Sequence, residues 1–478
     1  MTDRLPPPVT LRIGPETLTE GSGGVHRHVS PVTAQVDADI PLAGPSEIAQ
    51  AVAAARAASD GWRRTPPSQR ARILWRLADL IDGHAEEFAH LGALDNGTPV
   101  SLCPVAHTAD WIRYFAGWAD IPKTEVTGSF TDNGEFSYTL AQPYGVIGMI
   151  ITWNAPLMSL GMKVPAALAA GNAVVIKPSE LTPFTSGLFA DLATEAGLPP
   201  GVLNILPGAR DAGVALIEHP DVDKISFTGG GTTATDILRR CAETVKPAVL
   251  ELGGKSANIV LDDADLETSC AIGTFMSVGI LSGQGCALPT RMLVHDSVYD
   301  EMLARVTQNA EGLAVGDPFD AATVSGPVIN EAAVNRILNV VHQAERDGAK
   351  LLTGGQRLDR EGFFLAPTIF ADVDPRSDLA QNEVFGPVLA ITRFSTDNEA
   401  ISIANGTRYG LSGCIQSRNI KRALTLAEEL ITGEVLINGA LNANARRPFG
   451  GIGASGHGKE GGKQGIEEFQ RIKTIAIA

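Results

Sequence analysis

The stretch GVIGMIITWNAPLMSLGMKVPAALAAGNAVVIK, residues 145–177, decides the fold class. It opens on an unbroken apolar run, continues with a helical segment from Pro156 to Ala170, and ends in a second apolar run that closes at Lys177. Short apolar runs bounded by glycine indicate buried strands. Two buried strands joined by a helix form a βαβ unit, which requires a parallel sheet with both faces covered.

The same alternation extends along most of the chain. Further strands are expected at LNIL, KISFT, PAVLEL, ANIVL, RMLVH, PVLAITRF and GEVLIN, and further helices near 182–196, 211–218 and 232–241. Closer to the start of the chain, Ser46 is expected to cap a helix that stops near Gly61, and apolar residues from Ile73 to Ile81 recur at helical spacing.

The fold class is therefore α/β with two large domains. We expect residues 1–121 and 144–253 to form a Rossmann-like parallel-sheet domain that binds a cofactor, and residues 254–454 to form a second α/β domain for catalysis. Residues 122–143 and 455–478, which contain FSYTL and QRIKTIAIA, are expected to form a small β extension for bridging and oligomerisation.

Composition excludes several classes of protein. The 478 residues include 38 Lys and Arg against 54 Asp and Glu, a formal charge of -16 that would repel nucleic acid. The first thirty residues lack a signal-peptide pattern, and no apolar run is long enough to cross a membrane, so a cytoplasmic location is expected. The five cysteines are odd in number and lack a CxxC pair, which argues against a disulfide framework or a metal site and leaves a free thiol for any special cysteine.

Polar groups follow several of the expected strands. Asn154 follows the first strand, Lys177 and Glu180 the second, Gly229–Gly231 follow KISFT, and Glu251 ends PAVLE. Ligands of open parallel sheets bind beyond the carboxyl ends of the strands, so this set suits an anionic, ribose-bearing ligand. The glycine turn is either a phosphate site at the start of a helix or simply a tight turn.

Two segments match nucleotide-binding motifs only in part. Gly451-x-Gly453-x-x-Gly456 has the GxGxxG spacing, but too little chain follows for a βαβ unit, so a flexible loop is expected. Gly254-Lys255-Ser256 imitates the end of a P-loop, but Val249 stands where the earlier glycine would be.

Cys286 and Glu251 are the candidates for chemistry. Cys286 lies in SGQGCALPTR between Gly285 and Ala287, a turn whose backbone N–H groups could stabilise a thiolate and an oxyanion. Glu251 follows apolar residues that would raise the pKa of its carboxyl toward that of a general base, although an exposed strand-end glutamate has the same sequence signature. No histidine has the context of a papain-like partner, and no GxSxG motif is present.

Seven motifs resemble, in order and spacing, those of the aldehyde dehydrogenase superfamily of the non-acylating type. They are WNAPL at 153–157, IKPSE at 176–180, FTG at 227–229, ELGGKS at 251–256, GQGC at 283–286, EVFGPV at 383–388 and PFGG at 448–451. The resemblance implies NAD-dependent oxidation of an aldehyde to a carboxylic acid through a cysteine thiohemiacetal and a thioester.

The same resemblance implies roles for individual residues. Cys286 would be the nucleophile, Asn154 and the N–H of Cys286 the oxyanion hole, and Glu251 the base that activates water. Lys177 is counted with these catalytic candidates and also, with Glu180, as the pair that binds the adenosine ribose. The implied cofactor contacts are Thr152, Trp153, Lys177, Ser179, Glu180, Gly213, Phe227, Gly229, Gly230, Leu252, Glu383 and Phe385. A carboxylate at Glu180 would repel a 2′-phosphate and favours NAD, although Lys177 leaves use of NADP open.

The chain departs from the family pattern in two places. Gly230 and Gly231 replace a Ser-Thr pair after FTG, which predicts weaker or more mobile cofactor binding. The implied substrate pocket consists of Ala155, Ser159, Met162, Gly285, Ala287, Ala443 and Phe449. Its small side chains favour a bulky or aromatic aldehyde, unless neighbouring loops fill the space. Arg446 and Arg447 are either a solvated pair or a site for an acidic semialdehyde.

Other functions stay open at this point. A CoA-acylating dehydrogenase, a thioesterase or esterase without redox chemistry, and a non-catalytic scaffold could share this fold. The expected assembly is a homodimer or a homotetramer.

Overall fold

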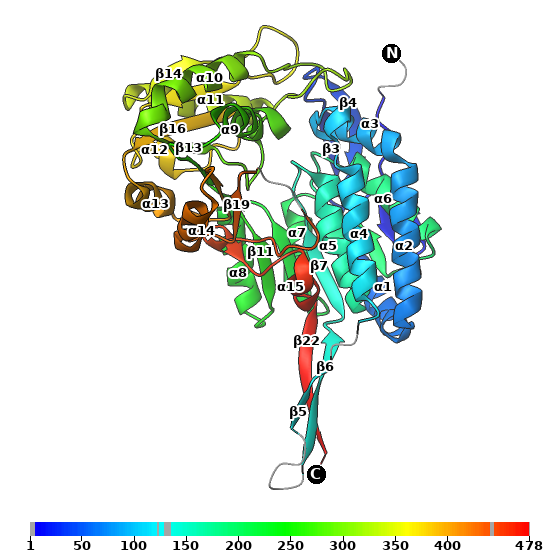
Figure 1. Ribbon diagram of the computed structural model, residues 1–478. Helices are drawn as coiled ribbons and strands as arrows, with labels where there is room; N and C mark the ends of the chain where they lie inside the picture. Colours follow the sequence, from blue (N-terminus) through cyan, green and yellow to red (C-terminus); the bar gives the residue numbers. More distant parts are fainter. Residues whose placement is uncertain (1–4, 122–123, 129–134, 440–443, 478) are drawn as a thin grey trace.

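The computed structural model describes residues 5–121, 124–128, 135–439 and 444–477. Two large open sheets, each covered by helices, form two lobes, and a slender β arm extends from the lower end of the lobe that contains β7 and α15 (Figure 1). The expected α/β class with parallel sheets is confirmed.

Eight strands form the first sheet, in the order β2-β1-β9-β8-β7-β10-β11-β21. Its parallel centre consists of β9 (Leu203–Ile205), β8 (Ala173–Lys177), β7 (Val146–Ile150), β10 (Lys224–Thr228) and β11 (Ala248–Glu251). The antiparallel edges are β1 (Leu11–Ile13) with β2 (Glu16–Leu18), and β21 (Gly456–His457). Both ends of the chain therefore contribute to this sheet.

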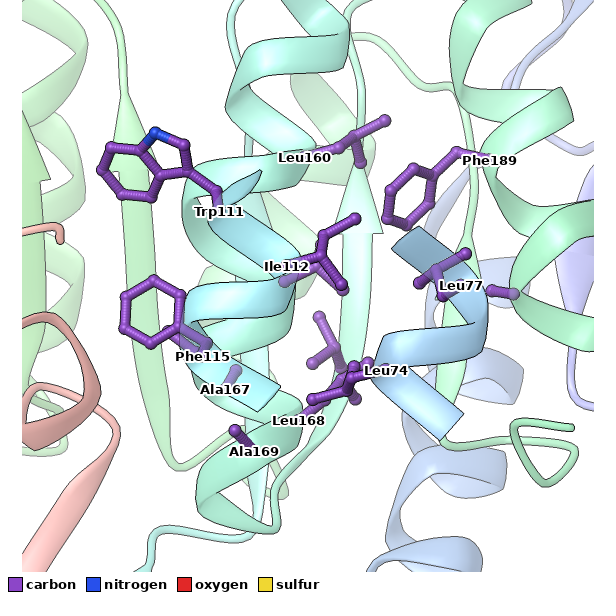
Figure 2. Close-up of a cluster of buried hydrophobic side chains, with 14 of the residues drawn as sticks. Leu74, Leu77, Trp111, Ile112, Phe115, Leu160, Ala167, Leu168, Ala169 and Phe189 are labelled. Atoms are coloured by element: carbon purple, nitrogen blue, oxygen red, sulfur yellow. The ribbon is translucent and has the colours of Figure 1, made fainter. Parts of the chain in front are cut away.

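Helices cover both faces of the first sheet because its strand residues are apolar on both sides. Ile147 and Met149 pack on one face with α2 (Pro67–Gly83), α4 (Val105–Trp118), α5 (Pro156–Ala170) and α6 (Phe184–Glu195). Figure 2 shows the centre of this layer, where Trp111, Ile112 and Phe115 of α4 meet the leucines of α2 and α5. Val146 and Ile150 face α1 (Pro45–Arg64), α7 (Arg210–Glu218) and α8 (Gly231–Ala242).

Seven strands form the second sheet, in the order β14-β15-β16-β13-β12-β18-β19. They are β14 (Lys350–Thr353), β15 (Thr368–Ala371), β16 (Val388–Phe394), β13 (Arg291–His295), β12 (Ala257–Val260), β18 (Ser412–Gln416) and β19 (Glu434–Ile437). All neighbours pair in parallel except β14 with β15. Helices α9 (Leu266–Thr274) and α10 (Tyr299–Glu311) cover one face, and α11 (Glu331–Arg346), α13 (Asp397–Asn405) and α14 (Ile420–Glu429) cover the other.

The arm is a three-stranded antiparallel sheet. Strand β6 (Phe136–Pro143) pairs along its whole length with β22 (Gln470–Ile477) and at its other edge with β5 (Val126–Gly128). FSYTL and QRIKTIAIA, which the sequence analysis assigned to a β extension, lie in strands of this arm, whereas the preceding residues 455–469 contribute β21 to the first sheet and also form α15. Val126, Ile472 and Ile477 leave apolar side chains exposed on it.

The remaining elements are short or lie at the rim. They are β3 (Val25–Val29), β4 (Val36–Pro41), α3 (Ala85–Asn96), α12 (Asp378–Gln381), β17 (Tyr409–Gly410), β20 (Ile452–Gly453), α15 (Gly462–Glu467), single helical turns at Val100–Leu102, Ile280–Gly283 and Asp296–Val298, and a π-helical turn at Phe275–Gly279. No helix among the described residues is long and apolar enough to cross a membrane.

Three local expectations were wrong. Ser46 lies inside the first turn of α1, and the carboxylate of Glu47 satisfies the backbone N–H of Gly44 in its place. Helix α1 also continues past Gly61 to Arg64, because an exposed helical glycine costs only about 1 kcal/mol and the tryptophan that follows it is buried. The segment 451–456 is not a flexible loop, because its two ends enter β20 and β21.

Candidate active site

Asn154 occupies the loop between β7 and α5, with its side chain held from two sides. Its Oδ1 accepts a hydrogen bond of 2.9 Å from the hydroxyl of Thr152, and its Nδ2 donates one of 2.7 Å to the carbonyl of Gln284. The amide orientation is therefore fixed, and the second N–H of Nδ2 is not committed to any described residue. A buried, oriented and free amide N–H is suited to receive a developing oxyanion.

The backbone of this loop is fastened by Asn96, at the end of α3. Its Nδ2 donates to the carbonyls of Trp153 at 3.0 Å and Asn154 at 2.9 Å, while its Oδ1 accepts from the backbone and hydroxyl of Thr98. Asn96 therefore sets the position of the loop, whereas Thr152 sets the rotation of the Asn154 amide.

Cys286 lies in a turn next to Asn154, as its glycine-flanked sequence predicts. Burial raises the pKa of its thiol to about 12, and the carboxylates of Glu383 and Glu251 add to that effect. The backbone N–H groups of Cys286 and Ala287 act in the opposite direction because they donate toward the sulfur. The thiol is thus protonated at rest, but two N–H donors already point at the place where negative charge would develop.

The segment before Cys286 has an unusual backbone. Leu281, Ser282 and Gly283 all have positive φ, at 51°, 52° and 70°. The hydroxyl of Ser282 donates at 2.7 Å to the carbonyl of Gly326, and a Cβ on Gly283 would lie 2.2 Å from the carbonyl of Gly386. Only glycine fits at that contact, so the cysteine loop is packed directly on the loop that carries Glu383 and Phe385.

Glu251 ends β11 as a buried carboxylate. Its side chain is 2% exposed, and neither carboxylate oxygen has a hydrogen-bond partner among the described residues. Burial raises the pKa of Glu251 well above its usual value, and the nearby Glu460 raises it further, while Lys163 and Lys459 oppose the shift. An unpaired carboxylate of raised pKa close to a thiol has the properties of a general base.

A buried ion pair adjoins this carboxylate. Nζ of Lys163, on α5, pairs with Glu460 and donates at 3.0 Å to the hydroxyl of Ser226. Gly450 also lies against this carboxylate, since a Cβ on Gly450 would come within 2.4 Å of Oε1 of Glu251. The carboxylate of Glu251 therefore lies between a charged pair and a glycine that leaves it room.

Glu383 and Phe385 lie on the loop against the cysteine segment. Oε1 of Glu383 accepts from the N–H of Gly254 at 3.0 Å, and burial raises the pKa of this carboxyl. The rings of Phe385 and Trp153 meet edge to face, with centroids 5.3 Å apart. One wall of the site is therefore aromatic, with a carboxylate beside it.

Lys177 ends β8 as a buried cation. Its Nζ donates to the carbonyls of Gly208 at 2.6 Å and Pro178 at 3.1 Å, and burial lowers its pKa while Glu180 opposes that shift. Gly213 packs against its aliphatic stem, where a Cβ would be 3.7 Å away. Ser179 and Glu180, which follow Lys177 in the sequence, are half-buried.

The first turn of α8 lies open beyond β10. Its N-cap is Gly230, which supplies no side-chain capping bond, and Cβ atoms on Gly230 or Gly231 would meet nothing within 4 Å. The uncapped N–H groups of this helix face open space, as a phosphate site would require. Phe227 and Leu252, also expected to contact the cofactor, are buried in the core beneath this edge.

Comparison with known proteins agrees with this geometry. The sequence profile described as "Aldehyde dehydrogenase family" matches residues 18–475. The chain belongs to the aldehyde dehydrogenase family.

Individual relatives support the same assignment. An aldehyde dehydrogenase of Emericella nidulans is 38% identical over 475 residues, covering 98% of this chain and 95% of that protein. The human cytosolic 10-formyltetrahydrofolate dehydrogenase is 38% identical over 485 residues, but this chain spans only 53% of it. The NAD+ complex of aldehyde dehydrogenase from Bacillus cereus superimposes with a TM-score of 0.96 at 35% identity, covering 100% of this chain and 98% of that one.

In this aldehyde dehydrogenase the predicted pocket residues have varied surroundings. Ser159 and Ala287 are buried, while Ala155, Met162, Gly285 and Phe449 are partly exposed; Ala443 lies outside the described residues. Arg446 is exposed, and Nε of Arg447 lies 3.2 Å from Glu434.

Sequence reasoning missed three residues around the candidate site in this aldehyde dehydrogenase. Asn96, Lys163 and Glu460 come close to the candidate residues only in the folded chain, whereas Gly450 belongs to the PFGG motif. Lys163 could have been found from the sequence, because a single lysine in the otherwise apolar helix α5 indicates a buried cation that needs a partner.

Proposed function

We propose that this enzyme oxidises an aldehyde to its carboxylic acid with NAD+, through a thiohemiacetal and a thioester on Cys286. The observation that carries the proposal is the arrangement around that thiol. Two backbone N–H groups point at the sulfur, Asn154 offers a free amide N–H, and Glu251 provides an unpaired buried carboxylate.

The first stage forms a covalent adduct. Glu251 takes the thiol proton, and the sulfur adds to the aldehyde carbon, so that the carbonyl oxygen becomes an oxyanion. The amide N–H of Asn154 and the backbone N–H of Cys286 receive that charge, a donor of this kind being worth roughly 2.7–4 kcal/mol. When bound, NAD+ supplies the hydride acceptor that turns the thiohemiacetal into a thioester.

The second stage releases the acid. Glu251 first releases the thiol proton to solvent. It then removes a proton from water as the water attacks the thioester carbon, and the sulfur leaves as a thiolate that takes up this proton from Glu251. The raised pKa of Glu251 suits both tasks, because the carboxyl gains and loses a proton nearer to neutral pH. A poised hydrolytic base also favours the free acid over transfer to CoA.

The residues present fit a dinucleotide. The uncapped first turn of α8 suits a pyrophosphate, Lys177 and Glu180 suit the hydroxyls of the adenosine ribose, and Glu383 suits those of the nicotinamide ribose. The carboxylate of Glu180 favours NAD over NADP because it would repel a 2′-phosphate. Gly230 offers only its backbone, so Gly230→Ser is expected to tighten NAD binding.

The substrate class is a bulky, hydrophobic or aromatic aldehyde. Ala155 and Gly285 contribute little volume, and Phe449 adds an aromatic surface. The exposed Arg446 gives no support for an acidic semialdehyde. We also propose a homodimer or homotetramer in which the arm joins subunits, because its exposed apolar residues need cover.

One experiment tests the reaction. The enzyme is assayed for NADH formation with aliphatic, aromatic and acidic aldehydes, and with NADP+ in place of NAD+. Activity should be highest with aromatic aldehydes and NAD+, and mass spectrometry of acid-quenched enzyme should show an acyl group on Cys286. Full dehydrogenase activity in Cys286→Ala would disprove the mechanism, and ester hydrolysis without NADH formation would instead indicate an esterase.

A further inference from the structure

A polar cavity lies in the second sheet, at the amino ends of β12, β13 and β18. Its lining includes four residues with polar side chains, Lys255, Ser256, Arg291 and Thr432. None of these four residues has a role in the proposed reaction.

Two buried cations border this cavity without a carboxylate partner. Lys255 is 1% exposed, and its Nζ has no hydrogen-bond partner among the described residues. Arg291 is 3% exposed and donates only to carbonyls, those of Lys255 at 2.8 Å, Ile403 at 2.9 Å and Ala404 at 2.7 Å. Burying a charge without a counter-charge costs several kcal/mol, so two such cations at one cavity call for an anion.

Two hydroxyl groups at the cavity are also unsatisfied. Oγ of Ser256 and Oγ1 of Thr432 are buried and lack partners within the described parts of the chain. Buried hydroxyls and ammonium groups are normally hydrogen-bonded, and a hydroxyl can turn its proton toward an acceptor. An apolar occupant would leave all three side-chain groups unpaired, and a metal cation would be repelled by Lys255 and Arg291.

We propose that this cavity binds a small monovalent anion, with chloride as the physiological occupant. The cavity volume is about 20 Å³, which leaves room for a single small occupant. Nζ of Lys255 and the hydroxyls of Ser256 and Thr432 coordinate the ion, and Arg291 adds positive charge behind them.

The protonation of Lys255 supports the need for this ion. Burial lowers the pKa of Lys255 to about 7 and Arg291 lowers it too, while Glu383 and Asp378 act in the opposite direction. A bound anion supplies the missing counter-charge and restores the ammonium form.

The ion is not a reactant, so this inference goes beyond the proposed function. It would act on the segment 254–256, whose first residue, Gly254, donates its N–H to Glu383 and leaves no room for a Cβ against the carbonyl of Cys286. An occupied cavity would hold this segment in place from the side opposite to the thiol.

Melting of the full-length apoenzyme tests the proposal. Sodium chloride replaces sodium gluconate at constant ionic strength, and the melting temperature is expected to rise saturably by about 2 °C or more. Lys255→Met should abolish the rise. Lys421→Met, which removes the same charge from an exposed position outside the cavity, should keep it.

Bromide gives an independent readout that needs no variant. Crystals of the wild-type enzyme soaked in sodium bromide should show an anomalous peak within hydrogen-bond distance of Nζ of Lys255. If Lys255→Met does not fold, Thr432→Val should weaken the chloride dependence severalfold. Water alone in the cavity at saturating bromide, or equal stabilisation by chloride and gluconate, would overturn the proposal. Neither result would bear on the dehydrogenase reaction.

Discussion

The hydroxyl of Thr152 donates a 2.9 Å hydrogen bond to Oδ1 of Asn154, two residues along the same loop. This bond fixes which end of the amide faces Gln284 and therefore where the free N–H points. Thr152 was expected to contact the cofactor, and its hydroxyl has this second role as a positioning group.

Thr152→Val should lower kcat about 3- to 10-fold, the effect of losing one hydrogen bond of about 0.5–1.5 kcal/mol. Steady-state kinetics should show a smaller change in KM for the aldehyde, and the melting temperature should stay near that of the wild type. Thr152→Ser keeps a hydroxyl and should recover most of the rate. Equal losses in the two variants would show that the methyl group matters instead.

Asn154→Ala should lower kcat by about 10²- to 10³-fold, because it removes an oxyanion donor from a buried site. Alkylation of Cys286 by iodoacetamide should be unaffected, since the donors to the sulfur are backbone N–H groups. A parallel loss of alkylation would mean that the substitution disturbs the cysteine loop itself.

The pH dependence of kcat should report the ionisation of the Glu251 carboxyl. Burial and Glu460 raise the pKa of this carboxyl, so its basic form appears at higher pH than for an exposed glutamate, and kcat should rise with pH through that raised value. Stopped-flow absorbance should show that Glu251→Gln slows the initial burst of NADH, because the thiol loses its base, and that steady-state turnover loses its rising limb. Retention of that limb in the variant would assign it to another group.

Gly450→Ala should impair hydrolysis and stability together. The new Cβ would lie 2.4 Å from Oε1 of Glu251, at a residue with φ of +144°. Gly348→Ala is the matched control, because Gly348 also has positive φ, at +93°, but a Cβ there meets nothing within 4 Å. Melting temperature and kcat are compared, and only Gly450→Ala should lose kcat.

Glu47 should stabilise the fold in a pH-dependent manner. Partial burial alone would raise its pKa, but hydrogen bonds from Ser22, Ser46 and Gly44 outweigh that effect and lower the pKa to about 2. The carboxylate therefore stabilises the native state above its unfolded pKa of 4.5, and this contribution fades as the pH falls from there toward 2. Glu47→Gln should cost roughly 1–3 kcal/mol at pH 7.

Thermal unfolding at several pH values checks this last prediction. The difference in melting temperature between the wild type and Glu47→Gln should be largest at neutral pH and shrink below about pH 4.5. A difference that does not depend on pH would point to altered packing at the start of α1 rather than to the charge.

The sequence predicted the parallel strands well because their apolar runs are uninterrupted, as from Val146 to Ile150. It did not predict the short strands that form only by pairing with residues far away in the sequence. Gly456 and His457 pair with Glu251 and Leu250, and a single histidine between two glycines carries no strand signal of its own. The predicted start of α1 was wrong for a related reason, since the N–H of Gly44 donates to Glu47, three places later, and not to Ser46.

For the site, residue types in motifs were enough to choose Cys286, Glu251 and Asn154. The charged neighbours of these residues could not be predicted from the sequence, because Lys163 and Glu460 are 297 positions apart and meet only beside Glu251. The strained backbone at Leu281 and Ser282 was equally hidden, since neither residue type favours positive φ.

Strand β21 has a consequence for how this enzyme is made. During synthesis the ribosome releases β11 about two hundred residues before the partner of Glu251, Gly456, exists. One edge of the first sheet therefore stays unpaired until the last part of the chain emerges, and the carboxylate of Glu251 is enclosed at the end of biogenesis rather than midway. A nascent chain stalled before residue 456 would carry the complete cysteine loop but would lack the strand that pairs with Glu251.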